Sequence, residues 1–176
     1  MNKKFWWMAG AGLAGLIAAF WQLLDKLQLL KHPGSVLSCN LNATFNCTKV
    51  LTSHQYEVFG FPNAMVGIVM FTFFLTVAIM VLGSKGVKRK LMLVVQGLAL
   101  FMLGFILWFV FESTFRIQAI CLFCTVIGTA VVTINAVMLR ENFGQKMGRW
   151  ASSGADLFGW ALLWLIVVGT VAIKLG

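Results

Sequence analysis

Five long stretches without a charged residue constrain this chain more than any other feature. Each approaches the length of about 20 residues that a helix needs to cross a bilayer at about 1.5 Å per residue. We expect membrane-spanning helices at 5–24, 62–82, 91–111, 119–139 and 157–173. Hydrophobic residues make up 60% of the 176 positions and charged residues only 11%, whereas soluble domains carry about 25% charged residues. The composition therefore predicts an all-α, multi-pass membrane protein with one integral membrane domain over 1–176.

Local signals refine these boundaries. The second span should begin near Pro62, because proline is tolerated in a first helical turn and Gly60 breaks what precedes it. A run of alanines and glycines in the first span permits close helix packing, and Trp160 and Trp164 in the fifth suit a membrane interface. The first span is longer than the apolar core of a signal peptide, so we expect it to be retained.

The distribution of Lys and Arg between alternate connections predicts the orientation. One side carries nine basic residues, namely Lys3, Lys4, Lys85, Lys88, Arg89, Lys90, Arg140, Lys146 and Arg149. The other carries five, namely Lys26, Lys31, Lys49, Arg116 and Lys174. Because basic connections stay in the cytoplasm, we expect the N-terminus inside and the C-terminus outside. The net charge of +9 then fits anionic lipid head groups in the bilayer and not a nucleic acid, since the basic residues fall in short, separate loops.

This orientation places residues 25–61, the one long connection, outside the cytoplasm. Loops of this length in compact proteins tend to be functional. All four cysteines fall on the same side, with Cys39 and Cys47 in the long loop and Cys121 and Cys124 at the mouth of the fourth expected span. Disulfides persist outside the cytoplasm, so the cysteines can form two, in three possible pairings. The spacing favours Cys39–Cys47 and Cys121–Cys124.

The Cys121-Leu-Phe-Cys124 motif is expected on the first turn of a helix. Unpaired backbone amides and the helix dipole favour a thiolate there. A structural disulfide at this spacing would gain little loop entropy, so the motif indicates redox chemistry. For Cys39 and Cys47 alone, a structural and a redox role both remain open. Two pairs on one face together suggest a relay between a soluble partner and an electron acceptor.

Other chemistries fit the spacings less well. The Cys-x-x-Cys half suits zinc, but the seven residues between Cys39 and Cys47 do not, and exported thiols are readily oxidised. Thr125 stands where covalent haem attachment needs a histidine. His32 and His54 read as solvated loop residues, although His54 is close enough to Cys47 in sequence to modulate its chemistry. We therefore expect no metal site.

Several segments in a fixed order carry a resemblance. They are Asp25-Lys-Leu-Gln-Leu-Leu-Lys-His-Pro33, Cys39-x7-Cys47, Thr48-Lys-Val-Leu-Thr-Ser53, Phe59-Gly-Phe-Pro-Asn-Ala-Met-Val-Gly67 and Cys121-Leu-Phe-Cys124. From about residue 5 to 139 the chain resembles the vitamin K epoxide reductase family, in its single-domain bacterial form. The resemblance implies a four-helix transmembrane bundle around a quinone, capped by the cysteine-bearing extracytoplasmic loop, with a fifth helix added here. DsbB-type oxidases do equivalent chemistry, but their Cys-x-x-Cys pair comes first in the chain.

The resemblance assigns a role to each cysteine. Cys39 would accept electrons from a soluble protein, and Cys47 would be the loop cysteine that meets Cys121. Cys124 would face the quinone.

Three further positions enter through the same resemblance. Ser53 resembles a serine at the end of the loop near the quinone, and Asn63 an asparagine that hydrogen-bonds a quinone carbonyl. Apart from the family, Asn63 could equally cap the second span, since a polar side chain there needs a partner. Mammalian members have a tyrosine four residues after the last cysteine, where this chain has Gly128. That departure puts epoxide reduction in doubt and is compatible with a quinone acceptor.

Together these features predict a quinone-dependent, disulfide-forming oxidoreductase. Some bacterial members carry a fused thioredoxin-like domain, whereas this chain stops soon after its fifth expected span. We therefore expect a separate exported thioredoxin-fold (DsbA-like) partner, whose electrons pass to menaquinone or ubiquinone. The alternative is a non-enzymatic membrane scaffold or transporter with structural disulfides.

Overall fold

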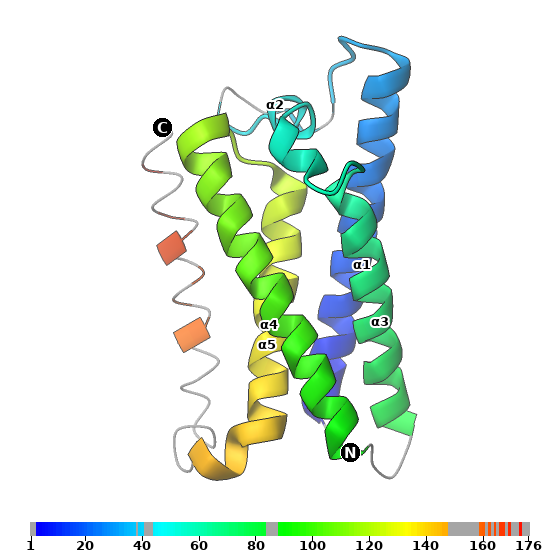
Figure 1. Ribbon diagram of the computed structural model, residues 1–176, viewed down its shortest axis with the longest axis vertical. Coiled ribbons are helices and arrows are strands. Elements are labelled where there is room, and N and C mark those ends of the chain that lie inside the picture. Colours follow the sequence, from blue (N-terminus) through cyan, green and yellow to red (C-terminus); the bar gives the residue numbers. More distant parts are fainter. Residues whose placement is uncertain are drawn as a thin grey trace.

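Four long helices dominate the computed structural model (Figure 1). The structure describes residues 3–37, 39–40, 44–83 and 88–147, and the separate positions 159, 160, 162, 164, 166, 167, 169 and 173. In chain order the elements are α1 (Lys3–Lys31), α2 (Cys47–Leu51), the 3-10 helix η1 (His54–Glu57), α3 (Asn63–Gly83), α4 (Arg89–Glu112), the π-helical turn η2 (Ser113–Ile117) and α5 (Leu122–Met147).

The four long helices confirm the all-helical membrane class. Within the described residues α1, α3, α4 and α5 are each long and apolar enough to cross a bilayer. They coincide with four of the five expected stretches. The fifth, 157–173, falls largely outside the described residues, so its expected helix stays a prediction.

The first and fourth helices have different ends from those expected. α1 continues past Leu24 to Lys31, so the residues from 25 to 31 are helical and not part of the outer loop. The charge-free stretch ends at Asp25 and Lys26, but both side chains are buried against protein partners and do not turn the chain into solvent. α5 begins at Leu122 and not at 119.

Small residues let α1 approach α3 closely. A Cβ atom on Gly15 would lie 2.5 Å from the Phe71 ring, and one on Gly12 would lie 3.3 Å from the Cβ of Leu75. Both positions belong to the small-residue run for which the sequence predicts close packing. α1 also packs against α5, and α5 against α4, which completes the bundle seen in Figure 1.

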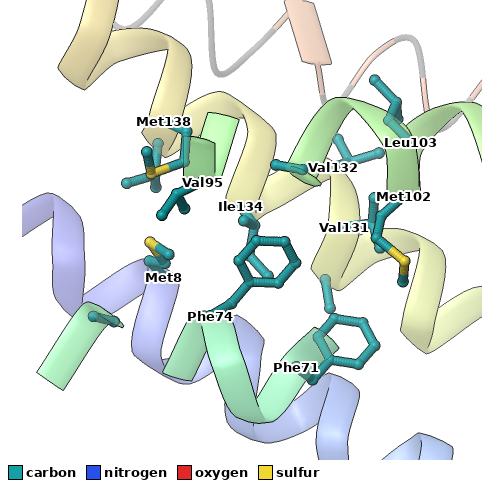
Figure 2. Close-up of a cluster of buried hydrophobic side chains, with 14 of the residues drawn as sticks. Met8, Phe71, Phe74, Val95, Met102, Leu103, Val131, Val132, Ile134 and Met138 are labelled. Carbon is teal, nitrogen blue, oxygen red and sulfur yellow. The ribbon is translucent and has the colours of Figure 1, made fainter. Parts of the chain in front are cut away.

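The middle of the bundle is filled by apolar side chains from all four helices, as Figure 2 shows. Phe71 and Phe74 of α3 are at most 1% exposed, and Ile134 of α5 is fully buried beside them. We call this cluster the bundle core. Its buried members that Figure 2 labels are Met8, Phe71, Phe74, Val95, Met102, Leu103, Val131, Val132, Ile134 and Met138.

The outer faces of the same helices are also apolar. Trp7, Val69 and Leu30 are 71%, 67% and 63% exposed. In water, apolar surface costs about 25 cal/mol per Å², so a soluble protein would have to cover these faces. Lipid is the solvent that makes them stable.

The described part of 32–62, which we call the cap, crosses one end of the bundle and contains α2 and η1 (Figure 1). Backbone hydrogen bonds join it to the start of α5, from Asn46 N to Ile120 O at 3.1 Å and from Ile120 N to Thr44 O at 2.8 Å. From below, the buried Lys26 ammonium donates to Leu51 O at 2.7 Å and pairs with Glu57 Oε1 at 3.0 Å. Polar contacts with α1 and with the residues before α5 therefore help to hold the cap in place.

Trp164 is buried inside the protein, and its expected place at a membrane interface stays a prediction. Its side chain is 6% exposed and belongs to the bundle core, where Nε1 donates to Thr129 Oγ1 at 2.9 Å. A Cβ atom on Gly128 would overlap the Trp164 indole ring. The absence of a side chain at 128 therefore makes room for an indole from the C-terminal segment.

Candidate active site

Cys39 and Cys47 are joined by a disulfide, as their spacing predicts. Their Cα atoms are 5.8 Å apart, within the usual range for such a bond. Asn40 holds the two ends of the loop together, since its side chain donates to Thr48 Oγ1 at 2.7 Å and accepts from Thr48 N at 3.1 Å. Asn46 caps α2 by accepting from Lys49 N at 3.0 Å. Local capping and turn chemistry therefore bring the two sulfurs together.

Cys121 and Cys124 are thiols in this structure, so the second expected disulfide is not formed. Cys121 immediately precedes α5, and Cys124 lies within its first turn. A hydrogen bond from the Cys124 side chain lowers the pKa of the Cys121 thiol, and the backbone N–H groups of Cys124 and Phe123 add to this against the effect of burial. The free amides of a helix start thus favour a thiolate at Cys121.

The two cysteine pairs meet through one short contact. Cys47 Sγ lies 3.6 Å from Cys121 Sγ, although 74 positions separate them in the chain. Cys121 and Cys47 are 1% and 0% exposed, so this contact is shielded from water. Disulfide exchange needs one sulfur to reach another, and this arrangement places a disulfide and a dithiol next to each other.

A cavity of about 50 Å³ lies beside Cys124. Three other polar side chains reach it, those of Gln22, Tyr56 and Asn63. The rest of the wall is apolar and comes from α3, α4 and α5, through Ala64, Val66, Gly67, Met102, Phe105, Ile106, Phe109, Ile127 and Val131. Such a wall with a few convergent polar groups is typical of small-molecule sites.

Within the described residues, two polar atoms on this cavity have no hydrogen-bond partner, the Tyr56 hydroxyl and Asn63 Oδ1. Burial raises the pKa of Tyr56, so its hydroxyl keeps the proton. A buried polar atom without a partner is unfavourable, and a bound ligand with oxygens would satisfy both atoms. The polar groups of a quinone match these two atoms, because its carbonyls could accept from Tyr56 and the hydroxyls of the reduced form could donate to Asn63. Its ring needs more space than about 50 Å³, since a cavity of about 150 Å³ is known to take benzene. Side chains must therefore move on binding.

Of the other two residues expected at the quinone, Asn63 lines the cavity and Ser53 does not. Asn63 begins α3 and lines the cavity, while its Nδ2 donates to Gln55 O at 2.8 Å. Ser53 Oγ donates to Val50 O at 2.7 Å and is not among the residues that line the cavity. A role for Ser53 at the quinone stays a prediction. His32 and His54 are exposed.

Four residues near the sulfurs are not identified from the sequence. Gln22 Nε2 donates to Cys124 Sγ at 3.1 Å, and Asp25 Oδ2 lies 3.6 Å from Cys39 Sγ. Lys26 supports the cap, and Tyr56 lines the cavity. A signal exists for three of them: 22, 25 and 26 follow the i, i+3, i+4 pattern of one helix face. That polar face follows a long apolar run.

Comparison with known families agrees with this site. The sequence model described as the vitamin K epoxide reductase family matches residues 6–140, which covers α1, the cap, α3, α4 and most of α5. All four cysteines and all the described residues of the cavity wall lie inside the match. Proteins of this family are membrane thiol oxidoreductases with quinone-related redox chemistry. The chain belongs to the vitamin K epoxide reductase family.

Proposed function

We propose that this protein is a quinone-coupled thiol oxidoreductase that reoxidises an exported thioredoxin-fold, DsbA-like protein and so supports disulfide formation. The observation that carries the proposal is the 3.6 Å contact between Cys47 and Cys121. It links a loop disulfide to a dithiol whose second sulfur, Cys124, lines an apolar cavity. The excess of Lys and Arg on the opposite side supports placing all four cysteines and the C-terminus outside the cytoplasm, with the N-terminus inside.

Electrons enter at the loop disulfide. A thiolate of the partner attacks Cys39, the Cys39–Cys47 bond breaks, and Cys47 takes the electron pair as a thiolate. The partner's second thiol then displaces Cys39 and leaves the partner oxidised. Cys39 is only 3% exposed, so the segment that carries it has to open when the partner binds.

Transfer to the helix pair follows along the short contact. The Cys47 thiolate attacks Cys121 of a Cys121–Cys124 disulfide, and Cys124 leaves as a thiolate. Cys39 then attacks Cys47, which restores the loop disulfide and releases Cys121. The product is a loop disulfide beside two helix thiols, which is the state that this structure has.

Electrons leave at the cavity. The two thiols of Cys121 and Cys124 would supply two electrons and two protons as their disulfide forms again, and a quinone held in the cavity would be the acceptor. Tyr56 and Asn63 would hold the quinone oxygens through their unpartnered atoms. Where mammalian members have a tyrosine, Gly128 is covered by Trp164. We therefore propose a quinone, and not an epoxide, as the acceptor.

The purified chain, a reduced thioredoxin-fold donor and a soluble quinone test this function. We expect Cys124→Ser to abolish quinone reduction, followed by quinone absorbance. Cys39→Ser should block electrons from the protein donor, because the donor's thiolate then has no loop disulfide to attack. Ubiquinone and menaquinone analogues compared in the same assay identify the acceptor.

The same variants distinguish the enzyme from a scaffold. Quinol formation by Cys124→Ser at the wild-type rate would refute the proposed electron path. If the cysteine variants lower only thermal stability and leave the donor's redox state unchanged, the disulfides are structural.

A further inference from the structure

Gln22 makes the closest polar contact with the cysteine that faces the cavity. Its side chain is 3% exposed on α1, and its Nε2 atom donates to Cys124 Sγ at 3.1 Å. The same atom lies 3.7 Å from Cys121 Sγ. Across the described residues, these are the hydrogen bonds that the structure gives this amide. The amide nitrogen of this buried glutamine therefore faces the sulfurs of both Cys121 and Cys124.

The proposed transfer puts a negative charge on this sulfur. When Cys47 attacks Cys121, the electron pair of the broken bond goes to Cys124 Sγ. The surrounding cavity wall is mostly apolar, and an uncompensated charge is unfavourable there. Cys121 has the backbone amides of Phe123 and Cys124 for its own charge. The leaving sulfur needs a donor, and the Gln22 amide is already in place.

We propose that Gln22 is a catalytic residue, whose amide donates to Cys124 and stabilises the thiolate that leaves when Cys47 attacks Cys121. This inference rests on the proposed function and adds a residue to it. No atom is transferred to or from Gln22, since the electron pair stays on sulfur and the amide contributes only its hydrogen bond. Its contact with Cys121 lets the same amide follow the charge as the disulfide forms again.

Alkylation measures this effect without a quinone or a protein donor. In a Cys121→Ser background with the Cys39–Cys47 disulfide intact, Cys124 is the one remaining thiol of the four cysteines. Iodoacetamide reacts with the thiolate, so the rate against pH gives the midpoint at which Cys124 ionises. Tyr56 is the other titratable group on the cavity wall, and it keeps its proton.

Adding Gln22→Leu should move the alkylation midpoint upward by about one pH unit, because a hydrogen bond to a charged group is worth about a tenfold change in equilibrium. In the four-cysteine protein we expect Gln22→Leu to slow donor-dependent quinone reduction about tenfold. Gln22→Met removes the donor with an unbranched side chain and should reproduce both results, which guards against a packing defect in either variant.

Gln96→Leu is the matched control. Gln96 is a buried glutamine of α4, and within the described residues neither polar atom of its amide has a partner. It lies six positions before Met102, the first residue of α4 on the cavity wall, or about 9 Å along a helix. We expect its alkylation midpoint and quinone reduction to match the wild type.

An unchanged midpoint in both Gln22 variants overturns the role of Gln22, even if the wild type reduces quinone. If the alkylation midpoint moves upward in the Gln22 variants but the four-cysteine protein reduces no quinone, the proposed function is refuted. The hydrogen bond from Gln22 to the Cys124 thiolate is then still supported. A shift of the same size in Gln96→Leu also overturns the proposal, because the effect then belongs to buried amides in general.

Discussion

The bundle core differs in construction from a second buried cluster, which we call the cap cluster. It consists of Leu29, Leu37, Cys39, Cys47, Val50, Leu51, Tyr56, Ala64, Phe109, Ala119 and Cys121. The bundle core contains only apolar and aromatic side chains, contributed by the four long helices and, through Trp164, by the C-terminal segment. The cap cluster combines apolar residues with Tyr56 and three of the four cysteines, Cys39, Cys47 and Cys121. Its links to the helices include single polar contacts, above all those of Lys26. From this difference we expect the bundle core to hold the fold, and the segment that carries Cys39 and Cys47 to open while the helices stay packed.

The largest loss of stability is expected from a substitution that creates a cavity in the bundle core. Phe71 is fully buried in α3, and Phe71→Ala should lower the free energy of unfolding by about 3–5 kcal/mol through lost contacts and a cavity. Denaturant unfolding in detergent micelles measures it. Val69→Ala on the lipid-facing side of the same helix is the control, with an expected change within about 0.5 kcal/mol. Equal losses from both changes would contradict the division into core and lipid faces.

A smaller and more local effect is expected from Lys26→Met. The change removes the hydrogen bond to Leu51 O and the pair with Glu57, which should favour opening of the cap by about 1.5–3 kcal/mol. Reduction of Cys39–Cys47 by dithiothreitol should then be at least about tenfold faster, as followed by mass spectrometry after thiol trapping.

Lys31→Met, at the exposed end of α1, is the control for charge and should not change that rate. If Lys26→Met instead lowers global stability as much as Phe71→Ala does, the cap and the bundle are one cooperative unit, and the comparison fails.

The smallest effect concerns pH at the junction of the two clusters. The lowered pKa of Cys121 arises chiefly from the Cys124 side chain, so Cys124→Ala should move the appearance of thiolate absorbance to higher pH. A lowered folded-state pKa stabilises the fold above the unfolded thiol's pKa, and this contribution is lost as pH falls through the folded value. Unfolding of the reduced protein across this window should therefore show stability that rises with pH, and less so in Cys124→Ala. A steeper rise of stability with pH in Cys124→Ala than in the wild type would contradict this prediction.

Sequence patterns predict the features that depend on residues close together in the chain. Apolar length identifies the four long helices, and short spacing identifies the Cys39–Cys47 disulfide. The end of α1 is mispredicted, because a charge-free count treats Asp25 and Lys26 as solvated when tertiary partners bury them. The burial of Trp164 is not predicted for a similar reason, since the space over Gly128 in another helix accepts its ring.

The site depends on contacts between distant parts of the chain. Gln22 and Cys124 are 102 positions apart, and Cys47 and Cys121 are 74 apart. Both separations are far longer than any sequence motif, so no local pattern indicates either contact. The meeting of Cys47 with Cys121 is expected through the family resemblance, whereas Gln22 and Tyr56 become visible only once the helices are packed. Their chemistry depends on what faces them and not on their neighbours in sequence.

The near-complete burial of Cys39, Cys47 and Cys121, at 3%, 0% and 1% exposure, has a kinetic consequence. Small thiols and oxidants in the surrounding medium react with sulfurs that they can reach, so a buried chain of sulfurs is insulated from them. Under the proposed function, electrons would be admitted only when a protein partner opens the cap, which makes the relay selective without a dedicated filter. Burial of this kind would keep small thiols of the medium from reducing the quinone pool directly through these cysteines.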